Sequence, residues 1–264
     1  MRTIPAIVSS IAFLLAGPVL AQQKPSPSTA PAAAAPAAGA ELPPQEVEED
    51  ALKALKRMGA YLDTLKTFGI TANTTIDVVT NDGQRLQLDG VTNYKVRRPN
   101  GFVIDMKSDI KKRTFFYDGK TFTVSAPELK YYATVDAPAT NAATLDAIYD
   151  KYGIALPLED LFHWNGDKTR EDQLISGFVV GPATIDGVET QHYAFREKDM
   201  DWQIWIQQGA KPLPKKLVII DRTDPTGPTY VARLNWVENP TYTQQDFAFT
   251  PASDAKPIKF MAAR

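Results

Sequence analysis

The fold is decided at residues 68–106, which read FGITANTTIDVVTNDGQRLQLDGVTNYKVRRPNGFVIDM. Apolar side chains recur there largely at every second position, beginning with Phe68 and Ile70. An alternation of period two is typical of a β-strand with one buried face. The runs are separated by the turn sequences Asn81-Asp82-Gly83 and Arg98-Pro99-Asn100-Gly101. Because such short turns join antiparallel neighbours, this stretch predicts consecutive antiparallel strands.

Helical periodicity appears on either side of the first strands. From Glu46 to Lys66, apolar residues recur at spacings of three and four, and acidic residues fill the first turn, where they suit the helix dipole. A second change of period predicts a helix from Thr140 to Tyr152, which Gly153 ends. Pro157 then opens a short helix through Phe162. These two helices form an insertion between two sets of strands.

Strands resume after the insertion, from about Ile175 to Val237, and a short last strand is predicted at Phe247–Phe249. Roughly ten or eleven strands are too many for a flat sheet, so the sheet should curl. The predicted class is α+β. We expect a curved antiparallel sheet, an incomplete β-barrel, with helices covering its apolar concave face.

The first 45 residues predict export rather than folding. Arg2, a dozen mostly apolar residues and a small-residue site ending at Ala21 have the order of a secretory signal peptide, 1–21. The alternative is a membrane anchor, but a spanning helix needs about 20 apolar residues. Residues 22–45 are rich in Pro and Ala and predict a disordered linker. Residues 46–264 then form a single domain, which we expect in the periplasm without a transmembrane segment.

Composition narrows the possible chemistry. The chain has no Cys, which removes thiol catalysis, redox motifs and most structural zinc sites. The formal net charge of −2 gives no basic field for nucleic acid. The short basic run Lys111-Lys112-Arg113 predicts a solvated turn. No nucleotide-binding, zinc-protease, calcium or serine-hydrolase motif appears, and we expect no cofactor, no metal and no enzymatic activity.

Three side chains leave alternatives open. His163 and His192 could each act as a base or ligand, or simply hydrogen-bond within the structure. In the strand Trp202-Gln203-Ile204-Trp205-Ile206, Trp202 shares a face with the isoleucines and Trp205 points the other way. Trp205 is therefore either covered by a rim or loop, or exposed as a contact surface for a partner.

Several segments together resemble a known but uncharacterised family. They are Tyr117-Asp118-Gly119-Lys120, Tyr131-Tyr132-Ala133-Thr134-Val135, Leu156-Pro157-Leu158-Glu159-Asp160-Leu161, Asp201-Trp202-Gln203-Ile204-Trp205-Ile206 and Leu213-Pro214-Lys215-Lys216-Leu217. They are similar to predicted periplasmic proteins grouped as domain of unknown function 2092. The resemblance covers nearly the whole domain.

A more remote resemblance is to the periplasmic lipoprotein carrier LolA. It lies in the first amphipathic helix and in Arg98-Pro99-Asn100, Asp118-Gly119-Lys120-Thr121 and Phe247-Ala248-Phe249-Thr250-Pro251, which follow the same order. The resemblance implies a LolA-like incomplete barrel with a hydrophobic cavity for acyl chains. It also implies that Arg98 bonds lid helices and holds the cavity shut. Arg98 could instead be a solvated turn residue.

The inward strand positions are the candidate ligand-binding residues, and they could equally be a plain core. They are Phe68, Ile70, Ile76, Leu88, Tyr94, Phe102, Ile104, Met106, Phe115, Phe122 and Trp202. The candidate lid consists of Arg98, Leu145, Ile148, Tyr149, Leu158, Leu161 and Phe162.

Three functions are compatible with these patterns. The first is a non-enzymatic periplasmic binding protein that holds a lipid-like or lipoprotein acyl ligand in a hydrophobic cavity. The second is an envelope interaction module that binds a protein partner without a ligand and exposes an apolar patch near Trp205. The third is a hydrolase that uses His192 with nearby carboxylates.

Overall fold

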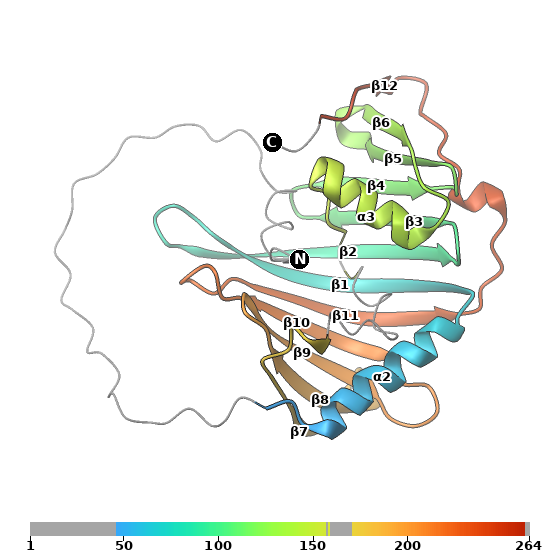
Figure 1. The fold of residues 1–264 in the computed structure, drawn as a ribbon. Coiled ribbons are helices and arrows are strands. Elements are labelled where there is room, and N and C mark those ends of the chain that lie inside the picture. Colours follow the sequence, from blue (N-terminus) through green and yellow to red (C-terminus); the bar gives the residue numbers. More distant parts are fainter. Residues whose placement is uncertain (1–45, 157, 159–170, 262–264) are drawn as a thin grey trace.

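The computed structural model describes residues 46–156, 158 and 171–261, and these form one large curved sheet with two α-helices (Figure 1). The predicted signal peptide and linker, and the short helix after Pro157 except for Leu158, lie outside the described residues. The predicted class, a curved and open antiparallel sheet with helices, is confirmed.

The sheet has twelve strands. Eleven of them form one antiparallel series in the order β6-β5-β4-β3-β2-β1-β11-β10-β9-β8-β7, and β12 pairs parallel with β6 at its edge. The elements in chain order are α2 (Glu49–Thr64), β1 (Thr67–Val79), β2 (Arg85–Arg97), β3 (Phe102–Ser108), β4 (Lys112–Tyr117), β5 (Thr121–Ala126), the 3-10 turn η1 (Pro127–Leu129), β6 (Tyr131–Asp136), α3 (Asn141–Tyr152), β7 (Ser176–Ile185), β8 (Val188–Arg196), β9 (Met200–Gln207), β10 (Pro214–Asp221), β11 (Thr229–Glu238), the 3-10 turn η3 (Gln244–Phe247) and β12 (Lys256–Pro257).

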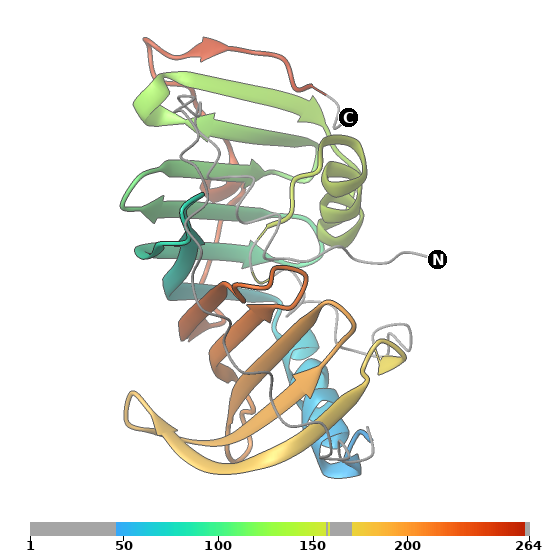
Figure 2. The same cartoon turned by 90° about the vertical axis from the view of Figure 1, so that its left-hand side faces the viewer.

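Strand β1 joins the two halves of the sheet. It pairs with β2 along its whole length, and on its other side with β11, so that Ile70 lies between Tyr94 and Trp236. Because side chains alternate along a strand, this register places the apolar residues of all three strands on one face. Figure 2 shows that the sheet bends toward that face without closing.

The two helices lie on the same, concave face (Figure 1). Helix α2 crosses the half of the sheet that contains β8 to β11, and α3 lies over β3 to β5. On α2, the residues that face the sheet are buried: Ala51, Ala54, Leu55, Met58, Gly59 and Leu62. The apolar stripe therefore explains both where the helix forms and which face it buries.

The start of α2 is attached to the edge strand β7. The amide of Glu48 donates to the carbonyl of Gly177 at 2.8 Å, and its carboxylate accepts from the amide of Val179 at 2.9 Å. A Cβ at position 177 would lie only 2.5 Å from Cδ1 of Phe195. Glycine at this position therefore leaves room for the Phe195 ring of the neighbouring strand β8, and Val47 before α2 packs close on the same spot.

The C-terminal segment wraps around the β6 edge. The ring of Phe249 contacts those of Phe116 and Tyr132 at 5.2 and 5.0 Å, and Phe260 then reaches Phe122 in the concave core at 6.2 Å. The short strand predicted at Phe247–Phe249 is wrong. The chain makes the 3-10 turn η3 there, because a capping box between Thr243 and Asp246 closes it.

A buried carboxylate fastens the β1–β2 hairpin to the start of β11. Asp77 accepts hydrogen bonds from Nη1 of Arg85 at 2.6 Å, from Nε2 of Gln87 at 3.2 Å and from the amide of Thr229 at 3.2 Å. Burial by itself would raise the pKa of Asp77, but these donors hold the pKa below its usual value. Arg85 also donates to the carbonyl of Thr226, so one ion pair ties the two hairpins together.

We expect Asp77→Asn to lower the free energy of unfolding at pH 7 by about 2 kcal/mol, because hydrogen bonds to a charged group contribute about that much. Since the folded-state pKa is lowered, the carboxylate stabilises the protein above the unfolded-state pKa of about 3.9 and loses that effect as pH falls. Denaturant unfolding, measured at intervals of roughly one pH unit, should therefore show that the difference in free energy of unfolding between wild type and Asp77→Asn becomes smaller from about pH 5 toward about pH 2. The exposed Asp136→Asn is the control. Equal stability of the Asp77 variant and wild type at pH 7 contradicts the prediction.

Candidate binding site on the concave face

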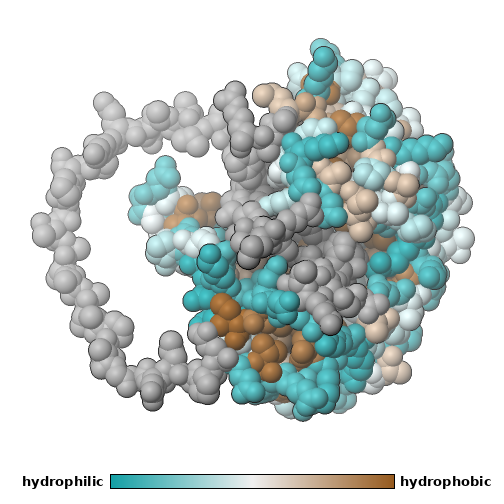
Figure 3. Space-filling view, in the orientation of Figure 1, coloured by the Kyte–Doolittle hydropathy of each residue, from teal (hydrophilic) through white to brown (hydrophobic). Residues whose placement is uncertain are grey.

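The concave face is not uniformly covered by the helices. In the space-filling view of this face, teal hydrophilic residues predominate and a brown apolar group lies beside α2, at the lower left (Figure 3). A cavity of about 70 Å³ opens on the same sheet at the end formed by the β1–β2 and β3–β4 hairpins. Its lining residues come from β1 to β4, the β3–β4 turn and β11: Thr74, Ile76, Leu88, Asp89, Gly90, Thr92, Met106, Lys107, Ser108, Lys111, Arg113, Phe115 and Tyr230.

The cavity exists because a row of small residues crosses the sheet. The register places Thr74 of β1 opposite Gly90 of β2, and Gly90 opposite Ser108 of β3. A Cβ at Gly90 would lie 2.9 Å from the carbonyl oxygen of Lys107 and 3.0 Å from Oγ1 of Thr74. Larger apolar residues lie on both sides of this row. Ile76 and Leu88 form the cross-strand pair on one side, and Met106, which pairs with Thr92, lies on the other. The hollow is thus built into the strand register.

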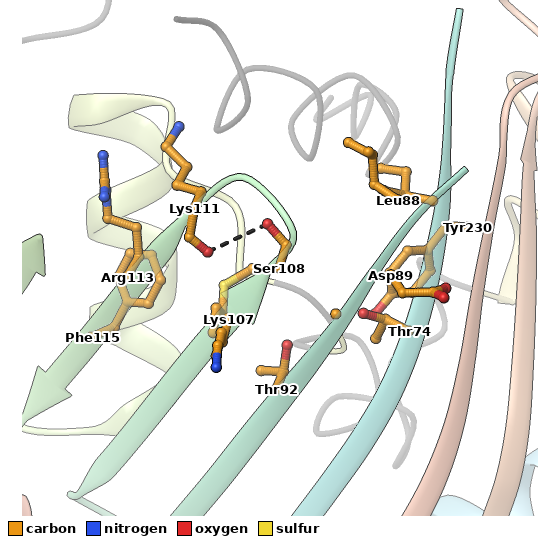
Figure 4. Close-up of a pocket in the computed structure, with 13 residues that line it drawn as sticks. Thr74, Leu88, Asp89, Thr92, Lys107, Ser108, Lys111, Arg113, Phe115 and Tyr230 are labelled. Atoms are coloured by element: carbon orange, nitrogen blue, oxygen red, sulfur yellow. Dashed lines mark hydrogen bonds between the residues drawn. The ribbon is translucent and has the colours of Figure 1, made fainter. Parts of the chain in front are cut away.

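One wall of the cavity is cationic. Figure 4 shows the side chains of Lys111 and Arg113 side by side with their nitrogens pointing the same way, while Lys107 points to the opposite side of the sheet. Both side chains are half-buried. Burial lowers the pKa of Lys111 and of Arg113, and the charge of Arg113 lowers the pKa of Lys111 further. The basic run was expected to be a solvated turn. Lys111 does lie in the β3–β4 turn, but it is half-buried, and Arg113 belongs to β4, where the strand alternation places its side chain on the cavity side, so the prediction is wrong in part.

A hydroxyl in the cavity wall has no hydrogen-bond partner. Tyr230 is 4% exposed, and its Oη is buried without a donor or acceptor nearby. Burial raises the pKa of this phenol. Buried polar atoms are nearly always paired, so this unpaired hydroxyl, which is inaccessible behind the cavity lining, marks an imperfectly packed part of the core beside the cavity. Neither Tyr230 nor the two cations were among the residues predicted from the sequence.

The predicted lining residues divide into two groups. Four of them line the cavity: Ile76, Leu88, Met106 and Phe115. The other seven are at most 5% exposed in the packed core, away from the cavity: Phe68, Ile70, Tyr94, Phe102, Ile104, Phe122 and Trp202.

The core around that second group is filled by aromatic rings. The Phe102 ring lies 5.2 Å from that of Tyr117, and Trp202 stacks on Phe195 at 4.3 Å. The unfilled part of the concave face is therefore the end near the hairpins.

Comparison with protein families identifies the chain. The model of the family described as "Predicted periplasmic protein (DUF2092)" matches residues 51–261. The chain belongs to this family. The match confirms the resemblance drawn from the sequence. Among curated proteins, no significant match to this DUF2092 chain is found.

Several solved structures are similar to this DUF2092 domain at low sequence identity. An uncharacterised conserved protein from Thermus thermophilus has a TM-score of 0.48 and 10% identity, with 80% of this chain and 99% of that one covered. LprF from Mycobacterium bovis has a TM-score of 0.45 and 15% identity, with 80% and 100% covered. A LolA superfamily protein from Nitrosomonas europaea has a TM-score of 0.37 and 9% identity, with 75% and 97% covered.

The predicted lid residues of this DUF2092 domain lie against the sheet. Leu145, Ile148 and Leu158 belong to the main core cluster and are at most 6% exposed. Tyr149 is half-buried on the same helix. Leu161 and Phe162 lie outside the described residues. Helix α3 is thus packed on the sheet, and it does not stand off from it.

The Arg97–Gly101 turn contacts both helices. The amide of Arg98 donates to the carbonyl of Lys66 at 2.8 Å, and its Nη2 lies 3.5 Å from Oδ1 of Asp63 in α2. Burial lowers the pKa of this guanidinium, and the charge of Asp63 opposes that effect. Arg98 is therefore a partly buried partner of α2, which the alternative of a solvated turn residue did not anticipate.

The other side of the Arg97–Gly101 turn holds α3. The amide of Asn141 donates to the carbonyl of Pro99 at 2.8 Å. Its side chain accepts from the amide of Gly101 at 2.7 Å and donates to the carbonyl of Arg97 at 3.1 Å. Both helices are thus anchored at the end of the sheet opposite the cavity.

The convex face carries the histidine and tryptophan that the sequence left open. Trp205 is 8% exposed, because His192 stacks on it at 3.9 Å and Nζ of Lys216 lies 4.3 Å from its ring centre. The imidazole of His192 faces the amide of Gln203 at 3.0 Å, and burial lowers its pKa. His163 lies outside the described residues. Trp205 is therefore covered, and His192 meets an amide where the hydrolase interpretation needs a carboxylate.

Within the described residues, no cluster of three or more His, Asp or Glu side chains is placed to bind a metal ion. No helix in the part of the chain that the structure describes is long and apolar enough to cross a bilayer.

We expect Tyr230→Phe to leave the free energy of unfolding unchanged or to raise it by up to about 1 kcal/mol, because the hydroxyl has no bond to lose. Tyr117→Phe is a matched control, since Tyr117 is fully buried and its hydroxyl donates to the carbonyl of Pro138 at 2.5 Å. That variant should lose about 1 kcal/mol or more. Denaturant unfolding measures both, and an equal loss in the two variants contradicts the prediction.

Asn141→Ala should loosen α3 while leaving the sheet intact, because it leaves the Gly101 amide and the Arg97 carbonyl without their partner. A loss of about 1–3 kcal/mol in local stability is expected. Hydrogen exchange should show faster exchange of the α3 amides, with those of β1 and β2 unchanged. Lys151→Ala, at the exposed far end of α3, is the control and should change neither. If the α3 amides of Asn141→Ala exchange as slowly as those of wild type, the anchoring role is contradicted.

Proposed function

We propose that this protein is a non-enzymatic periplasmic binding protein that holds the apolar part of a lipid-like or acylated ligand in the concave-face cavity. One observation carries the proposal: a largely apolar cavity, lined by Ile76, Leu88, Met106 and Phe115, opens on the concave face of the sheet. The walls offer burial to an apolar group. A site of this kind binds by shape and burial and needs no catalytic group.

The energetics fit an alkyl chain. Burying a methylene group contributes about 0.8 kcal/mol, so a few of them in the cavity give measurable affinity. The volume of about 70 Å³ is small beside the roughly 300–1,000 Å³ of typical ligand pockets. The cavity therefore takes only one end of the ligand, and the remainder lies along the concave face.

Movement of α3 would enlarge the site. In this proposal the lid consists of α3 and the residue that follows it, with Leu145, Ile148, Tyr149 and Leu158 covering the sheet when no ligand is bound. The Arg97–Gly101 turn anchors both helices at the far end of the sheet, so it is the natural pivot for such a movement. Arg98 holds α2 in place through Asp63, and the bonds of Asn141 to the same turn hold α3 in the closed state.

The periplasm is the proposed location. The family description supports it, as does the order of basic, apolar and small residues in 1–21, which is that of a cleaved signal peptide. Residues 22–45 then serve as a tether, and 46–264 form the binding domain.

A second candidate function is an envelope interaction module. It is favoured by Phe178 and Val180 of the edge strand β7, which are each 48% exposed. Exposed apolar residues on an edge strand are a common feature of protein contact surfaces. A purified protein that carries no lipid and takes up no alkyl probe would favour this function over the first.

Leu88→Trp should fill the cavity and weaken binding of a fluorescent fatty-acid probe by about tenfold or more, because the probe and the indole compete for the same volume. Leu86→Trp is a matched control, since Leu86 lies two residues away on the same face, 40% exposed and outside the cavity. Native mass spectrometry of the gently purified protein should also show co-purifying lipid in wild type and less of it in Leu88→Trp.

Circular dichroism and thermal melting establish that both variants fold. Equal probe binding by the two variants contradicts this location for the site. A wild-type protein that binds no alkyl probe contradicts the function itself.

A further inference from the structure

One wall of the cavity carries two cations, and the binding of an uncharged alkyl chain does not involve them. The apolar residues of the cavity come mainly from β1, β2 and β3, whereas Lys111 and Arg113 stand together on the wall formed by the β3–β4 turn and β4. We infer, on the basis of the proposed function, that the ligand is a single-chain amphiphile with a carboxylate or phosphate head group, which Lys111 and Arg113 bind.

The backbone fixes the positions of the two cations. Arg113 pairs with Met106 across the β3–β4 ladder, so its side chain leaves the sheet on the cavity side. The turn before it is closed by the amide of Ser108, which donates to the carbonyl of Lys111 at 2.8 Å, while Oγ of Ser108 lies 3.3 Å from the same oxygen (Figure 4). The backbone therefore places Lys111 and Arg113 two residues apart, with both side chains on the cavity side of the sheet (Figure 4).

Neither cation has a carboxylate partner. Among the described residues, no Asp or Glu oxygen lies within 4.0 Å of Lys111 or Arg113. Arg113 donates from Nη1 to the carbonyl of Lys112 at 2.7 Å, and the charge of Glu128 acts on Arg113 only from a greater distance. The one carboxylate in the cavity lining, that of Asp89, accepts from Thr75 at 2.6 Å on the convex side.

Two other partly buried arginines of this protein lie close to carboxylates. Arg196 makes a two-pronged contact with Asp201, at 2.7 and 2.8 Å. Arg98 lies 3.5 Å from Asp63. A half-buried cation costs free energy unless an anion accompanies it, and here two of them adjoin each other at a cavity. A bound anion is the partner that this arrangement lacks.

The chemistry of the two groups defines the class of head group. A guanidinium donates two parallel hydrogen bonds to a carboxylate or a phosphate, and an ammonium adds a point charge beside it. A head group at this wall would place the first methylene groups of its chain over Met106 and Phe115 and toward Leu88. A fatty acid and an alkyl phosphate both match this description.

The test compares three probes of equal chain length: a fatty acid, an alkyl phosphate and a fatty alcohol. Calorimetry with the mature protein should give at least about tenfold tighter binding for one of the anions than for the alcohol. The tighter of the two anions identifies the head group. Raising the salt concentration should weaken binding of the anion and leave binding of the alcohol unchanged.

The double variant Lys111→Gln/Arg113→Gln should bind the anion no more tightly than the alcohol. Its affinity for the alcohol should equal that of wild type. Lys112→Gln/Lys120→Gln is a matched control, because it removes the same charge from two lysines that do not line the cavity: Lys112 lies on the opposite face of β4, and Lys120 is exposed. That variant should retain the preference for the anion.

Equal binding of all three probes by wild type, or an undiminished preference in Lys111→Gln/Arg113→Gln, overturns the head-group assignment and leaves the proposed function standing. Failure of every probe to bind wild type overturns both. If the double variant folds poorly, the salt series on wild type gives an independent answer. A preference for the anion that high salt does not reduce contradicts the head-group assignment.

Discussion

The pairing of β1 with β2 on one side and with β11 on the other holds this molecule together. The two halves of the sheet come from opposite ends of the chain, and β1 joins them through two ladders that keep one apolar face continuous. An open sheet with a continuous apolar face must be covered. Helix α2 covers one half and α3 the other, and their anchoring points lie at one end of the sheet. Among the residues that the structure describes, the opposite end is therefore the place where the cover is thinnest and a cavity can form.

The cavity follows from register more than from residue type. Thr74, Gly90 and Ser108 are far apart in sequence, and each by itself looks like a tolerable small residue in a strand. Only the ladder brings them into one row, where a side chain at position 90 would meet backbone. A packed sheet normally fills such a row with branched side chains, since voids forfeit dispersion contacts. Keeping the row small weakens the fold locally, which is understandable if something else occupies the space.

The sequence was sufficient for the fold class and insufficient for the site. The alternation that begins at Phe68 and Ile70 and the helical stripe of α2 depend on local periodicity, and both were predicted. The packing of α3 decides which inward residues form a solid core and which border the cavity. The strand alternation does not contain this information, so Phe102 and Met106 looked equivalent in the sequence. Tyr230 could not be distinguished from other inward aromatic residues, because an unpaired hydroxyl is a property of three-dimensional surroundings.

Without a ligand, the two adjacent cations of this cavity are electrostatically unfavourable. Binding of an anion should therefore also stabilise the folded protein. Lys111 and Arg113 are partly removed from water without a carboxylate, and the lowered pKa of each shows that the fold disfavours its charged form. An anion at this wall would reverse that preference and restore the pKa values toward or above their ordinary range. A group that binds the folded state alone also stabilises it. The same two side chains that cost the ligand-free protein free energy would therefore contribute most to the affinity for an anionic head group, and an uncharged lipid could not relieve them.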